Sequence, residues 1–354
     1  MSASGAAGGS APVAGPSSGN AAVAGSSVVK ASDIKQLLLD RIALLTGGRD
    51  RKGRPVLVCP SRENAEKTTA EEVKLVLLYM HTIPSDETKE LGFIVLIDMR
   101  HGMTWNAVKP ILKTLQENFP GTVHCVYIIK PDRFWDKHKA SIASAKYKFD
   151  VQLISIENLI KFIDPSQLTP DFDGTLHYDH DEWVQLRVAL EGYIWRSLDV
   201  LRVFDSIRQE LESSELPPDV ESAKLALESH VQAKRRIAKA PVEQLEQEGQ
   251  QLIYRLTGAG NVGEDGSAGN GGGADSDYGS AGRDSMASNP DFASTAPHIA
   301  SLSENLRSTR QELFTKWQAR KQRLDQCFQL KLFQQDADKI GGAEKQIVYA
   351  SIIV

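Results

Sequence analysis

Residues 93–129 read FIVLIDMRHGMTWNAVKPILKTLQENFPGTVHCVYII, and this stretch decides the fold of the first half of the chain. Its two ends, Phe93–Ile97 and Val123–Ile129, are mostly apolar runs, which predict buried strands. Between them we predict a helix from about Asn106 to Asn118, because its apolar residues recur at helical spacing. Apolar strands that alternate with amphipathic helices are typical of a mostly parallel sheet covered by helices.

The same alternation extends on both sides of this stretch. Toward the N-terminus it predicts a helix from Asp33 to about Leu45, a hairpin turn at Arg49–Gly53, a strand at Val56–Cys59 and a helix from about Thr69 to His81. Toward the C-terminus it predicts a helix near Arg133–Tyr147, a strand at Val151–Ile156 and a helix at Glu157–Ile163. We therefore predict an α/β domain over residues 33–177.

The strands stop after this domain, and long helices replace them. Apolar residues recur at three-to-four spacing from Trp183 to Leu211, which predicts one long helix that ends before Pro217–Pro218. A second helix is predicted from about Ala223 to Leu256, with a kink at Pro241, and a third begins near Ala300. Three long helices in sequence favour an all-α, triple-helical bundle over residues 178–340.

Two segments have a composition that does not favour folding. Residues 1–32 are almost entirely Ala, Gly, Ser, Pro and Val, and residues 258–297 are rich in Gly, Ser and Asp. Neither segment has enough bulky apolar surface to offset the entropy of ordering, so we expect both to be disordered.

Composition narrows the functional class. The net charge of −5 over 354 residues argues against binding to nucleic acid, which requires a clustered basic surface. The three cysteines lie far apart in the sequence, so we expect free thiols in a reducing compartment. No apolar run approaches the length of about 20 residues that spans a bilayer, and no signal peptide is visible. We expect a cytoplasmic protein, and leave open a peripheral attachment to membrane or cytoskeleton.

Three motifs are candidates for sites of chemistry. Residues Gly48–Pro55 resemble a phosphate-binding loop, but Arg54 and Pro55 replace the required Lys and Ser or Thr, which favours a hairpin turn. Asp98 ends a central strand, where α/β sheets place ligands, but we favour a role in ordering the following turn. The cluster formed by His177, Asp179, His180 and Asp181 contains zinc-ligand types, yet acidic residues at a helix start have an electrostatic explanation. We predict no catalytic residues, no metal and no cofactor.

Several stretches resemble the CRAL-TRIO lipid-binding domain. They are Asp50–Val56, similar to its opening hairpin, Gly92–Met99, similar to its central strand, Lys130–Trp135, similar to a strand-to-helix corner, and Ile163–Gly174, similar to its closing signature. Together with Lys239–Leu245 and Lys321–Leu330, they resemble the Trio/Kalirin family of guanine nucleotide exchange factors for Rho-family GTPases. The resemblance covers about residues 33–340 and implies a CRAL-TRIO domain followed by a spectrin-type repeat.

The last residues, 341–354, depart from this resemblance. In that family the last helix continues into the next repeat, whereas Gly341–Gly342 is expected to break it here. We interpret residues 341–354 as an atypical tail and hypothesise a truncated isoform or an incomplete gene model.

The resemblance also implies a lipid site. CRAL-TRIO domains hold acyl chains in an apolar cavity, and the matching wall positions here are Ile94, Leu96, Val126 and Ile128, while Lys146 matches a position that faces a lipid headgroup. The expected ligand is a phospholipid or phosphoinositide. Ordinary core packing for the four apolar residues, and an ordinary surface position for Lys146, remain open as alternatives.

Two functions follow from this resemblance. The first is a non-catalytic scaffold and targeting segment of a Trio-like exchange factor, acting in Rac/Rho signalling, actin remodelling and axon guidance. Protein partners would bind the spectrin-like helices. Rho or Rac GTPases would bind only through modules that are absent from this sequence. The second is a stand-alone CRAL-TRIO protein that binds phospholipid or phosphoinositide.

Overall fold

A computed structural model describes residues 29–63, 65–130, 147–212, 215–257 and 289–352, with side chains to residue 341. Its first half is a five-stranded sheet in the order β1-β2-β3-β4-β5. The strands are β1 (Leu44–Arg49), β2 (Pro55–Cys59), β3 (Phe93–Asp98), β4 (Val123–Ile129) and β5 (Asp150–Ile154). Only the β1–β2 pair is antiparallel, so the predicted mostly parallel sheet is confirmed.

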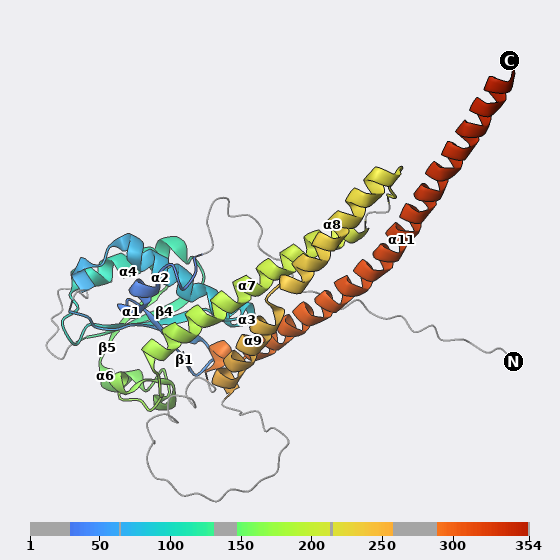
Figure 1. Cartoon of the computed structure of the whole chain (residues 1–354). Helices are drawn as coiled ribbons and strands as arrows, with labels where there is room; N and C mark the ends of the chain where they lie inside the picture. Colours follow the sequence, from blue (N-terminus) through green and yellow to red (C-terminus); the bar gives the residue numbers. More distant parts are fainter. Residues whose placement is uncertain (1–28, 64, 131–146, 213–214, 258–288, 353–354) are drawn as a thin grey trace, which may run out of the picture.

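Helices cover both faces of this sheet (Figure 1). One face carries α1 (Lys35–Leu39), α2 (Ala70–Thr82) and α4 (Trp105–Asn118), and the other carries α6 (Ile156–Leu159) with two short 3-10 turns, η2 (Pro165–Gln167) and η3 (Pro170–Phe172). A further short helix, α3 (Asp86–Glu90), precedes β3. The helix α2 begins with a capping box, in which the Thr69 and Glu72 side chains bond to each other's backbone N–H groups.

The predicted helix from Asp33 to Leu45 is wrong in its second half. The helix α1 ends at Leu39, and Arg41 adopts a left-handed backbone with φ of 55°. This turn redirects the chain, and Leu44 and Leu45 begin β1. The predicted helix Glu157–Ile163 is also shortened to α6, after which Ile163 packs into the core. Most of the predicted helix near Arg133–Tyr147 lies outside the described residues.

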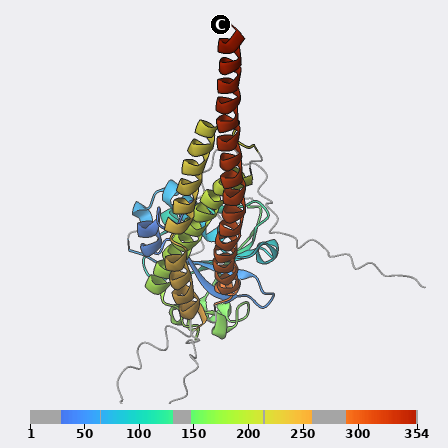
Figure 2. The same ribbon diagram turned by 45° about the vertical axis from the view of Figure 1, so that its right-hand side comes forward.

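The second half is a bundle with three legs. The first leg is α7 (His180–Glu212), the second is α8 (Val220–Lys239) followed by α9 (Val242–Thr257), and the third is α11 (Thr295–Ile352). The predicted kink at Pro241 is a complete break, because Ala240 is extended with ψ of 133°, as is usual before proline. Figures 1 and 2 show α11 extending past the ends of the other helices.

Three boundaries differ from the expectations. Residues 29–32, which we assigned to a disordered segment, are described, and Ala31 is fully buried. Residues 289–297, which we assigned to a disordered segment, form the 3-10 turn η4 (Pro290–Phe292) and the start of α11. The expected break at Gly341–Gly342 is wrong, since α11 continues to Ile352. A glycine costs a helix only about 1 kcal/mol relative to alanine, which a long helix tolerates. Residues 1–28 and 258–288 lie outside the described residues.

One hydrophobic core runs from the sheet into the bundle. It joins Val95 and Val126 of the sheet to Trp183 of α7 and Leu306 of α11. The three cysteines are free and buried. Within the described ranges, none of the helices is both long and apolar enough to cross a membrane.

Candidate functional site

The four apolar residues predicted to line a lipid pocket lie on opposite faces of the sheet. Residues alternate in direction along a strand, and the β3–β4 register pairs Ile94 with Cys125 and Val95 with Val126. Consequently Ile94 and Leu96 face the side of α6, while Val126 and Ile128 face α2 and α4. All four are at most 1% exposed. The structure therefore does not bring them together around one cavity.

The face that contains Ile94 and Leu96 is filled by the chain segment after β5. The buried side chains that pack there are Leu159, Ile163, Leu168 and Phe172. Arg100 holds this segment in place, because its guanidinium donates to the Asp171 carbonyl oxygen at 2.6 Å and lies over the Phe172 ring. Side chains of the protein itself thus occupy the space beside these two strands.

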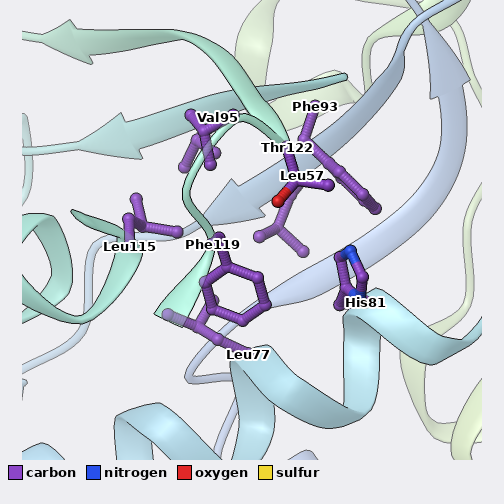
Figure 3. Close-up of a pocket in the computed structure, with 9 residues that line it drawn as sticks. Leu57, Leu77, His81, Phe93, Val95, Leu115, Phe119 and Thr122 are labelled. Carbon is purple, nitrogen blue, oxygen red and sulfur yellow. The ribbon is translucent and has the colours of Figure 1, made fainter. Parts of the chain in front are cut away.

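The opposite face contains a small cavity between α2, α4 and the strands (Figure 3). Its volume is about 10 Å³, and its walls are Leu57, Leu77, His81, Phe93, Val95, Leu115, Phe119, Thr122 and Val123. Such a volume holds about one water molecule. An acyl chain therefore does not fit into this cavity in this conformation.

His81 is the one basic side chain among the described residues that form the wall of that cavity. Its ring lies 5.6 Å from the Phe93 ring and 5.3 Å from the Phe119 ring, measured between centroids. Burial lowers the pKa of His81, and the nearby Lys89 lowers it further. Its Nε2 atom is buried and makes no hydrogen bond within the described part of the chain. The sequence analysis missed His81 because it reads as an ordinary residue in the last turn of a helix.

Asp98 orders the turn after β3, as the sequence analysis favoured. Its carboxylate accepts hydrogen bonds from the Arg100 backbone N–H and from the Arg100 Nε, both at 2.9 Å. The same guanidinium also donates to Asp98 Oδ2 at 3.0 Å. These interactions of Asp98 therefore stabilise local structure.

His180 is a structural residue at the start of α7. Its Nδ1 lies 2.7 Å from the Tyr178 hydroxyl and its Nε2 lies 2.7 Å from the Leu38 carbonyl oxygen, so both ring nitrogens are engaged. Asp179 accepts a hydrogen bond from the Glu182 N–H and caps the helix. In the described ranges, no three His, Cys, Asp or Glu side chains are grouped to hold a metal ion.

The thiols are poorly suited to nucleophilic chemistry. Burial raises the pKa of Cys59 to about 12, and burial together with Asp150 raises the pKa of Cys125 to about 12. A thiol with such a pKa stays protonated at neutral pH, whereas the thiolate is the reactive form.

The two halves of the chain are connected by a set of polar contacts that we call the domain–bundle junction. It consists of Tyr79, Arg187, Glu191 and the Arg49–Asp291 pair. The Tyr79 hydroxyl donates to Glu191 at 2.7 Å, and Arg187 donates to Tyr79 at 3.2 Å and to Glu191 at 3.1 Å. Glu191 also accepts from the Ala31 backbone N–H at 2.7 Å. One carboxylate of α7 therefore binds the N-terminal segment and α2 together.

The second part of this junction links β1 to the turn before α11. Arg49 pairs with Asp291 at 2.5 Å, and the Asp291 side chain is fully buried. Gly47, with φ of 88°, lies directly against Asn289, where a Cβ atom would come within 2.5 Å of the amide oxygen. Arg49 and Asp291 are 242 residues apart in the sequence. The two glycines before Arg49 are the local feature of the sequence at this contact, and they do not indicate its partner.

Lys146, the predicted headgroup ligand, lies outside the described residues. Its role therefore remains a prediction.

Comparisons with known proteins match both halves of the chain. Residues 53–181 match the model of the divergent CRAL/TRIO domain. The SEC14 domain and spectrin repeat-containing protein 1 of Mus musculus is 37% identical over 177 residues, which are 49% of this chain and 25% of that protein. The guanine nucleotide exchange factor DBS of Mus musculus is 29% identical over 318 residues, which are 86% of this chain and 25% of that protein. The chain thus spans about a quarter of the length of these relatives.

Proposed function

We propose that this chain is a non-catalytic scaffold and targeting segment of a Trio-like protein, in which a divergent CRAL/TRIO domain precedes a helical bundle. The observation that carries this proposal is the shared core, which runs from the sheet through α7 to α11. A domain fixed to a bundle presents its surfaces at a set distance and orientation, which is what a scaffold requires.

The similarity extends across this shared unit. The match to an exchange factor covers 86% of the chain and therefore includes the domain and much of the bundle. From the resemblance to the Trio/Kalirin family, we place the segment in Rac/Rho signalling, with actin remodelling and axon guidance as the processes it serves. Any partner contacted directly would be a protein bound by the helices, and contact with Rho or Rac would need additional modules.

The chemistry of the described residues supports a role without catalysis. Asp98 and His180 use their polar atoms in structural hydrogen bonds, and the buried thiols Cys59 and Cys125 have raised pKa values. We assign no exchange activity and no other turnover to these residues.

A lipid-binding function is the second candidate. The match to a CRAL/TRIO domain favours it, as does the apolar cavity beside His81. That cavity of about 10 Å³ would have to expand greatly to accept an acyl chain. On this geometry the scaffold is the stronger proposal.

Lipid extraction from the purified protein separates the two candidates. Mass spectrometry of the extract should find lipid far below one molecule per chain if the segment is a scaffold. Lipid in a one-to-one ratio would overturn the scaffold proposal in favour of a carrier.

Lys146→Glu is the matching variant for a liposome assay with phosphoinositide. We expect wild type and variant to bind equally weakly, with unchanged melting temperature. Binding by wild type that the variant loses would instead establish Lys146 as a headgroup ligand. Lys148→Glu, two residues further along, is the control for a general loss of positive charge.

A further inference from the structure

The break between α8 and α9 opens a groove on the side of the bundle. Ala240 leaves the helix with an extended backbone, Pro241 follows, and α9 begins at Val242. The α8–α9 groove has a volume of about 370 Å³ and is lined by Asp199, Val200, Val203, Arg236, Lys239, Ala240 and Pro241. Its size lies in the range of roughly 300–1,000 Å³ that is typical of ligand pockets.

The floor of the groove is apolar and partly exposed to solvent. It consists of Val200 and Val203 on α7 together with Ala240 and Pro241 at the break. Val203 is 48% exposed, whereas Val200 beside it is 9% exposed.

The rim of the groove is cationic. Lys239 and Arg236 line it, and Arg235 lies on the same side of α8 as Lys239 because the two are four residues apart. Arg236 is neutralised by an ion pair with Glu210, and Asp199 is neutralised by Arg202. Lys239 and Arg235 have no ion pair with any residue that the structure describes, so the rim keeps a net positive charge.

We propose that the α8–α9 groove binds a short acidic, aliphatic segment of a partner protein. Aliphatic side chains would cover Val200, Val203 and Pro241, while a carboxylate would pair with Lys239. The chain as a whole has a net charge of −5, so an unpaired cationic rim beside an apolar floor marks this place for an acidic ligand. The groove deepens the scaffold function proposed above and rests on it.

A second groove on the bundle shows why charge decides the occupant. It lies between α9 and α11, and it is lined by residues of both signs, including Glu243, Glu246, Glu304, Arg307 and Arg310. Arg310 pairs with Glu243, and Arg307 pairs with Glu304. Glu246 has no ion pair with any residue that the structure describes, so this groove keeps a net negative charge, opposite to that of the α8–α9 groove.

Selection from a display library of short random peptides on the full chain tests the proposal. We expect the enriched peptides to carry Asp or Glu beside Val, Ile or Leu. Synthetic copies of the enriched peptides should bind Lys239→Glu about fivefold more weakly than wild type, because an exposed ion pair becomes a repulsion. Val203→Glu should weaken binding about tenfold, because it places a charge on the apolar floor.

Lys224→Glu is the matched control, since it makes the same charge change on the exposed surface of α8 near its other end. It should bind the peptides as wild type does, and circular dichroism should show all three variants folded. Three results would overturn the proposal. They are no enrichment of any peptide, enrichment of peptides without acidic residues, and binding by Lys239→Glu and Val203→Glu that is as strong as binding by wild type. If the peptide selection fails and the purified protein contains no lipid, the groove proposal is wrong but the scaffold proposal stands. If the lipid extraction finds one lipid per chain, the scaffold proposal is wrong whatever the peptide selection shows.

Discussion

The sheet and the bundle differ in how far their apolar residues are buried. In the sheet every residue of β3 is buried, and both of its faces are filled by side chains of the chain itself. The bundle leaves Val203, Leu225, Phe333 and other large apolar residues exposed. A parallel sheet with two covered faces has no free apolar surface, whereas a helix keeps one side outward. Most of the exposed large apolar residues therefore lie on the bundle, and the α/β domain adds Leu91 and Ile160.

The sharpest test of this contrast is one substitution made in both regions. Leu96→Ala removes a fully buried side chain from β3, so it should lower the free energy of unfolding by about 2–5 kcal/mol. Leu198→Ala, at a position 36% exposed on α7, should lower it by less than about 1 kcal/mol. Urea denaturation followed by circular dichroism measures both. Similar losses for the two variants would mean that the regions do not differ in packing.

The domain–bundle junction should carry the next largest effect. Glu191→Gln removes the charge that compensates Arg187, so the guanidinium remains in a mostly buried place without its partner. We expect a loss of about 2 kcal/mol in the free energy of unfolding. Glu248→Gln breaks the more exposed pair with Arg196 and should cost less than about 1 kcal/mol. If Glu191→Gln and Glu248→Gln lower the free energy of unfolding equally, the junction adds nothing to the coupling of the two regions.

A smaller effect should appear on acidification. Burial lowers the pKa of His180 in the folded state, so the unfolded chain binds its proton more readily. The stability that His180 contributes is therefore complete above its unfolded pKa of about 6.5 and is lost as the pH falls through the lower folded value. Urea denaturation between about pH 7.5 and about pH 5 should show stability falling with pH.

His180→Gln should make this decline shallower, because the variant has no group to protonate there. His298→Gln, on the exposed surface of α11, is the control and should leave the decline unchanged. If His180→Gln keeps the full decline, then other groups, such as His81 or His230, account for it.

Patterns along a single element predicted the fold better than contacts between elements. The bounds of β3, α4 and β4 were close to the predicted ones, because each is a continuous apolar or amphipathic run between turn residues. The strand β1 was missed, because Leu44 and Leu45 continue the helical spacing of α1 and two glycines follow. Only the left-handed turn at Arg41 separates the two elements, and no residue type at that position signals it.

The candidate site was predicted less well for the same reason. Alternation along a strand correctly places Ile94 and Leu96 on one face of β3, and Val126 and Ile128 on one face of β4. It does not say which face of β4 continues which face of β3, because that relation depends on the register between strands, which the sequence does not contain. Pro241, by contrast, gave a local signal for an interruption of the helix, but the sequence analysis did not predict the groove that lies there.

The smallest expected effect concerns α11 beyond the bundle, where the helix has few neighbours to support it. Gly341 lies in this helix, and a Cβ atom added there meets no other atom within 4 Å. Gly341→Ala should therefore stabilise the helix by up to about 1 kcal/mol through its higher helix propensity. Hydrogen exchange at the amides after Ile340 should slow, while exchange in β3 should not change. Slowing in both places would mean that the end of α11 unfolds together with the sheet, and the contrast between the two regions would not extend to this helix end.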